Sequence, residues 1–209
     1  MKNILILGAS GHLGKVLVKY CLEKNYSVVT LVRNPKKINL THDNLKIING
    51  SVADKNDLKK VFSNIDVVVS VLGHGFRTSF PIQEKTMINL FPTMEKNRVK
   101  RFITVTGAGL KMKGDPHSYT ADISEKIFNI VDPYRMKDAK NQQILIEKSN
   151  LDWTVVRTPV HNNSNNQIIS KIGFNQPPAW KTISRTAISR FIIDCIEHNQ
   201  WIKKAPIIY

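Results

Sequence analysis

Apolar residues along the chain fall into short continuous runs that alternate with longer amphipathic segments. The runs are rich in Ile, Leu and Val, which is typical of strands buried on both faces of a parallel sheet. These predicted strands cover Ile4–Leu7, Ser27–Val32, Leu45–Ile48, Asp66–Val71, Arg101–Thr106 and Trp153–Arg157. Helical periodicity is found at Gly11–Lys24, Asp54–Ser63, Pro81–Lys96, Pro133–Lys148 and Ser184–Asn199. This alternation predicts an α/β fold of the Rossmann type, a doubly wound parallel sheet with helices on both faces.

Two polar segments are expected to be long loops. "GAGLKMKGDPHSYTAD" follows the fifth predicted strand and "HNNSNNQ" follows the sixth. Both leave from the carboxyl ends of strands, where open α/β sheets bind their ligands. A short last strand, Pro206–Tyr209, is expected to close one edge of the sheet. No linker or repeat divides the chain, so residues 1–209 are predicted to form one domain, with a small substrate-side portion from about residue 159 to 209.

Composition and charge narrow the classes of function. The 209 residues include 31 Lys and Arg against 16 Asp and Glu, a formal net charge of +15. The lysines are scattered and match no nucleic-acid recognition motif, so we expect a basic surface that favours small anionic ligands. No apolar run approaches the roughly 20 residues of a membrane span, and the first residues lead directly into a predicted strand. These features predict a cytoplasmic protein without a specific nucleic-acid or membrane partner.

The two cysteines, Cys21 and Cys195, fall in apolar stripes with helical spacing. We therefore expect both thiols to be buried as small apolar groups. No spacing in the chain resembles a metal-ligand set or a redox pair of cysteines, and no metal site is predicted. At Asp132, an acidic residue before a proline predicts the start of a helix at residue 133.

The first predicted strand leads into "GASGHLG", in which glycines at positions 8, 11 and 14 precede a helix. Gly8 permits a sharp turn, Gly11 lets the backbone approach a pyrophosphate, and Gly14 allows the helix to pack closely. Free N–H groups and the positive end of the helix dipole favour phosphate. This context predicts dinucleotide binding rather than a simple turn. The predicted cofactor-binding residues of this loop are Gly8, Ser10, Gly11, His12, Leu13 and Gly14.

The end of the second predicted strand indicates which dinucleotide is bound. An acidic residue there would bind the ribose 2′-hydroxyl of NAD, whereas an arginine accommodates the 2′-phosphate of NADP. The sequence continues "LVRNPKK", with Arg33 at this position and no carboxylate nearby. A guanidinium can bind phosphate through two parallel hydrogen bonds. The predicted cofactor is therefore NADP(H).

Several stretches together resemble the atypical short-chain dehydrogenases/reductases of the NAD(P)H-binding, NmrA-like group. These are "ILILGASGHLGKVLV", "LVRNPKK", "IINGSVAD", "DVVVSVLGHG", "VKRFITVTGAG", "SNLDWTVVRTP" and "KTISRTAISRFI". The resemblance covers almost the whole chain and implies further residues along the cofactor. They are Ser51, Val52, Leu72 and Gly73 on the adenine and nicotinamide sides, and Pro159 and Val160 beside the nicotinamide.

The catalytic signature of typical members, a Ser followed by Tyr-x-x-x-Lys, is not intact. Thr106 occupies the serine position, Tyr119 has Ile123 four residues later, and Tyr134 has Asp138 there. The tyrosine/lysine mechanism is therefore not supported. Candidates to position an acceptor or a proton are Tyr134, Thr106, His74 and His117, with His74 expected nearest to the nicotinamide.

Three functions remain open. The group includes flavin and biliverdin-type reductases and quinone reductases, which implies an NADPH-dependent enzyme transferring hydride to a small conjugated acceptor. It also includes redox-sensing regulators without turnover, which the missing tyrosine/lysine pair favours. A nucleotide-sugar epimerase or dehydratase is the third, although it normally needs that pair and a larger carboxyl-terminal domain. The chain is expected to act as a monomer or a homodimer.

Overall fold

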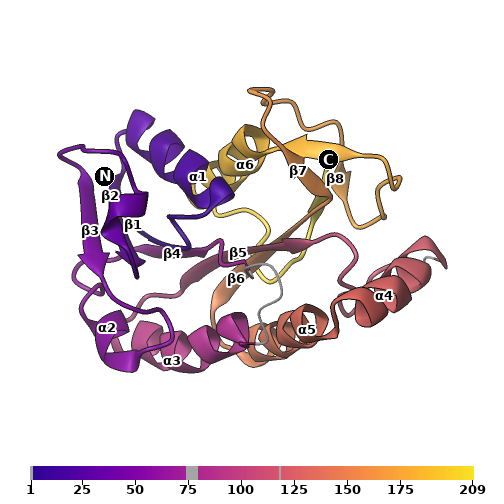
Figure 1. The fold of residues 1–209 in the computed structure, drawn as a ribbon, viewed down its shortest axis with the longest axis horizontal. Helices are drawn as coiled ribbons and strands as arrows, with labels where there is room; N and C mark the ends of the chain where they lie inside the picture. The colour runs from indigo at the N-terminus through magenta and orange to yellow at the C-terminus, as the bar shows by residue number, and fades with distance from the viewer. Residues whose placement is uncertain (1, 74–79, 118) are drawn as a thin grey trace.

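The computed structural model describes residues 2–73, 80–117 and 119–209, which form one twisted sheet between two layers of helices (Figure 1). The strands are β1 (Asn3–Leu7), β2 (Ser27–Val32), β3 (Leu45–Asn49), β4 (Val67–Ser70), β5 (Arg101–Gly107), β6 (Asp152–Thr158), β7 (Val160–Asn162), β8 (Ile172–Gly173), β9 (Thr182–Ser184) and β10 (Ile207–Ile208). The helices are α1 (His12–Glu23), the short 3₁₀ turn η1 (Pro35–Lys37), α2 (Lys55–Lys59), α3 (Ile82–Lys96), α4 (Tyr119–Val131), α5 (Pro133–Lys148) and α6 (Arg185–Glu197).

The strand order in the main sheet is β3-β2-β1-β4-β5-β6-β10-β8. All neighbours are parallel except β8, which pairs antiparallel with β10, and a separate parallel pair joins β7 to β9. The order reverses between β1 and β4, and open α/β sheets bind ligands at the carboxyl ends of the strands beside such a reversal. This arrangement confirms the predicted Rossmann-type fold.

The helices divide between the two faces of the sheet, with α1 and α6 on one and α2, α3 and α5 on the other (Figure 1). Strand β1 shows why its sequence is continuously apolar. Ile4 and Ile6 pack in the core beneath α1 and α6, whereas Leu5 and Leu7 pack in the core on the opposite face. Each strand residue thus meets an apolar layer whichever way its side chain points.

Local predictions about helices are also confirmed. Cys21 and Cys195 are buried on α1 and α6, and burial raises the pKa of each thiol to about 12. Asp132 begins α5, since its carboxylate accepts a hydrogen bond of 3.1 Å from the Arg135 backbone N–H. None of the described helices is both long enough and apolar enough to span a membrane.

Several details differ from the sequence prediction, including β7 and β9, which were not predicted as strands. The segment expected to be a loop after β5 gives way to a helix, α4, at Tyr119. The last strand, β10, does not form the edge of the sheet, because β8, from a segment with no predicted strand, pairs outside it. Helix α2 ends at Lys59, four residues earlier than predicted. Very short strands depend on pairing with distant segments, which local periodicity does not reveal.

Candidate functional site

The glycine loop connects β1 to α1. Its backbone passes close to the backbone after β4 at Gly8, and α1 passes close to the loop at Gly14. Gly8 has a φ of +89°, and a Cβ at this residue would lie 2.7 Å from the carbonyl oxygen of Val71. A Cβ at Gly14 would lie 2.1 Å from the Gly8 carbonyl oxygen. Both distances are too short for a real side chain, so these glycines allow the loop to pass against the end of β4 and α1 to pack against the loop.

Gly11 is the N-cap residue of α1. Its backbone is extended, and within this described segment no side chain caps the helix. The first N–H groups of α1 and the positive end of its dipole therefore fit an anionic group such as a pyrophosphate. Ser10, which is half-buried, and His12, which is exposed, flank Gly11. The Leu13 side chain is buried in the core, so its backbone N–H is the part suited to a ligand.

Arg33 directly follows β2, which is the parallel neighbour of β1. It therefore lies at the carboxyl ends of the strands, as the glycine loop does. Its side chain is exposed and has no hydrogen-bond or ion-pair partner in the described part of the chain. Asn34 caps the next turn by accepting a 3.1 Å hydrogen bond from the Lys36 backbone N–H. The N–H donors of the Arg33 guanidinium are thus available to an anion bound at the carboxyl ends of β1 and β2.

The segment after β3 carries the predicted residues Ser51 and Val52. Oδ2 of Asp57 accepts a 2.9 Å hydrogen bond from the Ser51 backbone N–H, and its Oδ1 lies 2.6 Å from Nζ of Lys60. Both hydrogen bonds lower the pKa of Asp57, and the one from Lys60 has the larger effect. Ser51 is half-buried, whereas the Val52 side chain lies in the core. Asp57 therefore fixes the backbone where the resemblance expects the adenine.

Leu72 and Gly73 continue the chain from the end of β4. The Leu72 carbonyl accepts a 3.0 Å hydrogen bond from Nε2 of Gln83, and Gly73 is exposed. A Cβ at Gly73 would meet no other atom of the described residues within 4 Å. His74 lies outside the described residues, so its predicted position beside the nicotinamide stays a prediction.

Thr106 lies near the carboxyl end of β5, beside β6. The Thr158 hydroxyl lies 3.4 Å from the Thr106 carbonyl oxygen and 2.8 Å from Nε2 of His161. Burial, together with the charge of Arg185, lowers the pKa of His161 to about 4. A neutral imidazole and the Thr158 hydroxyl thus lie together where β5 and β6 end, and neither Thr158 nor His161 was predicted from the sequence.

Pro159 links β6 to β7, Val160 is the first residue of β7, and the Val160 side chain is exposed. Tyr134 is exposed in the first turn of α5, and no hydrogen bond joins it to Thr106 among the described residues. His117 is also exposed and stacks edge-on against Tyr119 at the start of α4. Among the described residues, no hydrogen bond or ion pair therefore joins Thr106, Tyr134 and His117 to one another.

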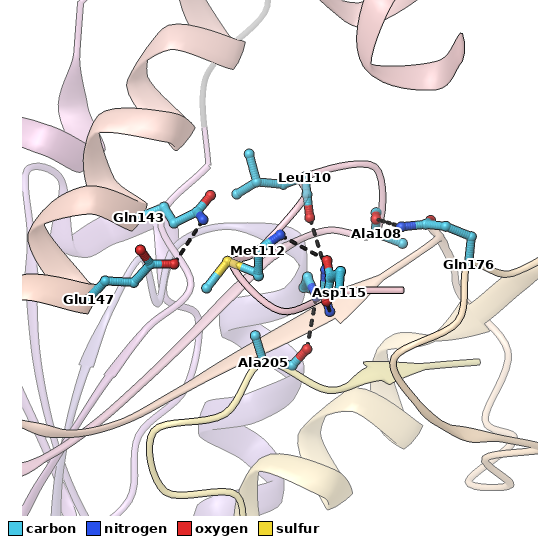
Figure 2. A network of polar contacts seen from close by, with 9 residues as sticks. Ala108, Leu110, Met112, Asp115, Gln143, Glu147, Gln176 and Ala205 are labelled. Carbon is cyan, nitrogen blue, oxygen red and sulfur yellow. Dashed lines mark hydrogen bonds and ion pairs between the residues drawn. The ribbon is translucent and has the colours of Figure 1, made fainter. Parts of the chain in front are cut away.

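A buried ion pair fixes the loop that follows β5. Arg157 on β6 is fully buried, and its guanidinium binds both carboxylate oxygens of Asp115, the Nη2–Oδ1 distance being 2.7 Å. Arg157 also donates to the carbonyls of Leu110 (3.1 Å) and Ala205 (2.9 Å). Asp115 in turn accepts a hydrogen bond from the Met112 backbone N–H at 2.8 Å (Figure 2).

The start of the same loop is held from two further segments. The Ala108 backbone N–H donates to the Thr158 carbonyl at 2.8 Å, and Nε2 of Gln176 donates to the Ala108 carbonyl at 2.7 Å (Figure 2). The sequence contained one signal for this network: Arg157 is a charged residue inside a predicted buried strand. A buried charge requires a partner, although the sequence did not indicate which one.

No group of three or more potential metal ligands occurs among the residues that the structure describes. The site consists instead of the backbone N–H groups at the start of α1, an arginine that has no partner among the described residues, and hydroxyl and imidazole groups at the ends of β5 and β6. Together with the strand order, these features define a Rossmann-type nucleotide-binding protein.

The family model for NAD(P)H-binding proteins matches residues 8–199. The chain therefore belongs to this NAD(P)H-binding family of atypical short-chain dehydrogenases/reductases, as its sequence motifs had indicated. Among solved structures, it is similar to a short-chain dehydrogenase/reductase from Veillonella parvula in complex with NADP, with a TM-score of 0.78 and 19% identity over 99% of this chain and 94% of that one. A Rossmann-fold NAD(P)-binding protein from Shigella flexneri gives 0.76 and 22% identity over 100% and 93%.

Several curated relatives match about half of this chain or less. A phenylcoumaran benzylic ether reductase of Pinus taeda is 29% identical over 111 residues, 48% of this chain and 34% of that protein. An uncharacterised oxidoreductase of Schizosaccharomyces pombe is 33% identical over 85 residues, 37% of this chain and 29% of that protein. The matches to the first three curated relatives span 29% to 32% of those proteins' lengths. A UPF0659 protein of Schizosaccharomyces pombe matches 98% of this chain at 22% identity.

Proposed function

We propose that the chain is an NADP(H)-dependent reductase. The observation that carries this proposal is Arg33, an exposed guanidinium at the end of β2 that has no partner among the described residues, where NAD-specific proteins place a carboxylate. The exposed lysines of η1, Lys36 and Lys37, add positive charge beside it. The Veillonella parvula neighbour, which contains NADP, supports the same choice of cofactor.

Different described residues would bind different parts of the cofactor. The backbone N–H groups from His12 to Gly14 would receive the pyrophosphate, Arg33 the 2′-phosphate and the Ser51 segment the adenine. Leu72, Gly73, Pro159 and Val160 would border the nicotinamide. When bound, NADPH would supply a hydride to an acceptor at the ends of β5 and β6.

We further propose that the acceptor is a small conjugated molecule such as a flavin or a quinone. Tyr134 and Asp138 do not form the tyrosine/lysine pair that protonates a carbonyl, so an acceptor that takes its proton from water or from a loop residue fits better. Apolar side chains are exposed after β6, namely Val160 (72%) and Trp180 (80%). Such side chains suit a planar ring system. Curated relatives named as reductases support the reaction class.

Thermal unfolding with either cofactor tests the choice of NADP(H). At 100-fold its dissociation constant, NADPH should raise the Tm by about 5–10 °C. NADH at the same concentration should raise it by less. Arg33→Ala should remove most of the difference between the two cofactors, whereas Arg98→Ala, an exposed arginine after α3, should preserve it. Equal stabilisation of the unaltered protein by NADH and NADPH would contradict the assignment.

Loss of NADPH absorbance with flavins and quinones tests turnover. The rival function is a redox sensor that binds NADP(H) without reducing an acceptor, and the absence of the tyrosine/lysine pair favours it. Tight NADPH binding without turnover on any of these acceptors would support the sensor. Turnover that is lost with Thr106→Val while NADPH binding is retained would support the reductase.

A further inference from the structure

Helix α4 turns an apolar face towards solvent. Tyr119, Ile123, Ile127 and Ile130 follow one another at intervals of four, four and three residues, which places them on one side of the helix. Val131, the last residue of α4, and Tyr134, in the first turn of α5, are also exposed. Their exposed fractions run from 53% for Ile127 to 82% for Ile130. Contiguous apolar surface of this kind marks an interaction site. The α4 face is defined as Tyr119, Ile123, Ile127, Ile130, Val131 and Tyr134.

The charged residues of α4 leave this face largely apolar. Asp122 forms an ion pair with Lys111 of the loop after β5, and Glu125 lies 2.6 Å from Nζ of Lys140 on α5. Both carboxylates are thereby tied to the body of the protein. Lys126 is the charged residue of α4 that has no partner in the described chain. Helix α4 lies at one end of the molecule beside α5, with its outer side uncovered (Figure 1).

We propose that the α4 face is the contact between two copies of this chain, packed as an antiparallel pair of α4 helices around a two-fold axis. At these exposed fractions, its six side chains offer on the order of 800 Å² per copy, which is the contribution of one partner to a standard interface. Aromatic residues and a lack of charge at the centre are also typical of such interfaces. Ile127 lies near the middle of the face and therefore near the axis.

The charges of α4 favour a second copy over an anionic membrane surface. Amphipathic helices that bind such membranes carry Lys and Arg beside the apolar face. Helix α4 has two carboxylates, Asp122 and Glu125, against one basic residue, Lys126. The net charge of +15 opposes association of two copies at low ionic strength, so added salt should strengthen the dimer. Salt would weaken binding to an anionic membrane. Added salt should therefore have opposite effects on dimerisation and on membrane binding.

Sedimentation velocity of the full chain over a range of concentrations tests the proposal. Ile127→Glu should weaken dimerisation by about 30-fold or more, because it places two charges near the axis. Ile88→Glu is the matched control, since Ile88 is also a helical isoleucine with 53% exposure, on α3. Far-UV circular dichroism should show both variants folded. A protein that stays monomeric at about 100 µM, far above the dissociation constants typical of standard interfaces, overturns the proposal, as does a dimer that only Ile88→Glu dissociates.

A cysteine cross-link and a salt series complete the test. Ile127→Cys should form a disulfide dimer under mild oxidation, while the native Cys21 and Cys195, exposed by 1% and 0%, stay unreacted. The dimer should tighten as NaCl rises from low to moderate concentration. Ile127-dependent binding of monomeric protein to phosphatidylserine vesicles, lost on adding salt, would overturn the proposal in favour of a membrane. The test involves neither cofactor nor acceptor, so its outcome is separate from that of the proposed reductase function.

Discussion

The Asp138 carboxylate on α5 caps the amino-terminus of α3, since its Oδ2 accepts a 2.9 Å hydrogen bond from the Gln83 backbone N–H. Its Oδ1 accepts a second hydrogen bond, of 2.8 Å, from the Glu84 backbone N–H. Asp138 is buried and lies four residues after Tyr134, where a lysine would complete a Tyr-x-x-x-Lys pair. In this chain the position joins two helices beside the site.

Replacement of Asp138 should therefore destabilise the fold. Asp138→Ala removes both hydrogen bonds and leaves two N–H groups of α3 without their acceptor, which should cost about 2–4 kcal/mol. Asp132→Ala, which removes the exposed cap of α5, should cost about 1 kcal/mol. Urea unfolding measures both. Equal losses of unfolding free energy in the two variants would show that the buried cap stabilises the protein no more than the exposed one.

The ion pair between Asp115 and Arg157 leads to a second prediction. Asp115→Ala leaves the buried guanidinium without its counter-charge, and the free energy of unfolding should fall by about 3–5 kcal/mol. Trypsin should then cleave faster at Lys111 and Lys113, because the loop after β5 is no longer held. Glu23→Ala, which breaks an exposed ion pair on α1, should change stability by less than about 1 kcal/mol.

A double-mutant cycle separates the pair from the other contacts of Arg157. Arg157→Met also removes the hydrogen bonds to Leu110 and Ala205. The double variant with Asp115→Ala should be less destabilised than the sum of the two single variants, by more than about 1 kcal/mol. Additive losses would show that the carboxylate and the guanidinium act independently.

The sequence predicted those parts of the protein that depend on local pattern. The strands from β1 to β6 lie within one residue of their predicted bounds, because each contains a short run of apolar, β-branched residues. The Asp115–Arg157 pair was missed because it joins residues 42 positions apart, and only the folded sheet brings them together. Helix α4 was also missed, although the spacing of Tyr119, Ile123 and Ile127 is helical. Its apolar face is exposed, and the polar residues that precede it are typical of a loop.

The glycine loop offers a pair of substitutions that separate folding from cofactor binding. Gly14→Ala would place a Cβ 2.1 Å from the Gly8 carbonyl oxygen, so it should destabilise the protein by several kcal/mol. Gly11→Ala meets the same oxygen at 3.3 Å and should change stability by less than about 1 kcal/mol. Gly11→Ala should still weaken NADPH binding, because its Cβ lies where the pyrophosphate would approach. Thermal unfolding without and with NADPH measures both effects, and undiminished stabilisation of Gly11→Ala would contradict the predicted cradle.

The buried imidazole of His161 should make stability depend on pH. Its pKa is lowered from 6.5 to about 4 in the folded state, by burial first and by Arg185 second. Between these pH values the unfolded chain binds a proton at this residue that the folded chain does not, so stability should fall as pH decreases from about 6.5 to about 4. The loss attributable to His161 should be at most about 3.5 kcal/mol. His161→Gln should reduce the slope in urea unfolding measured across this range, and an unchanged slope would show that His161 is not the group responsible.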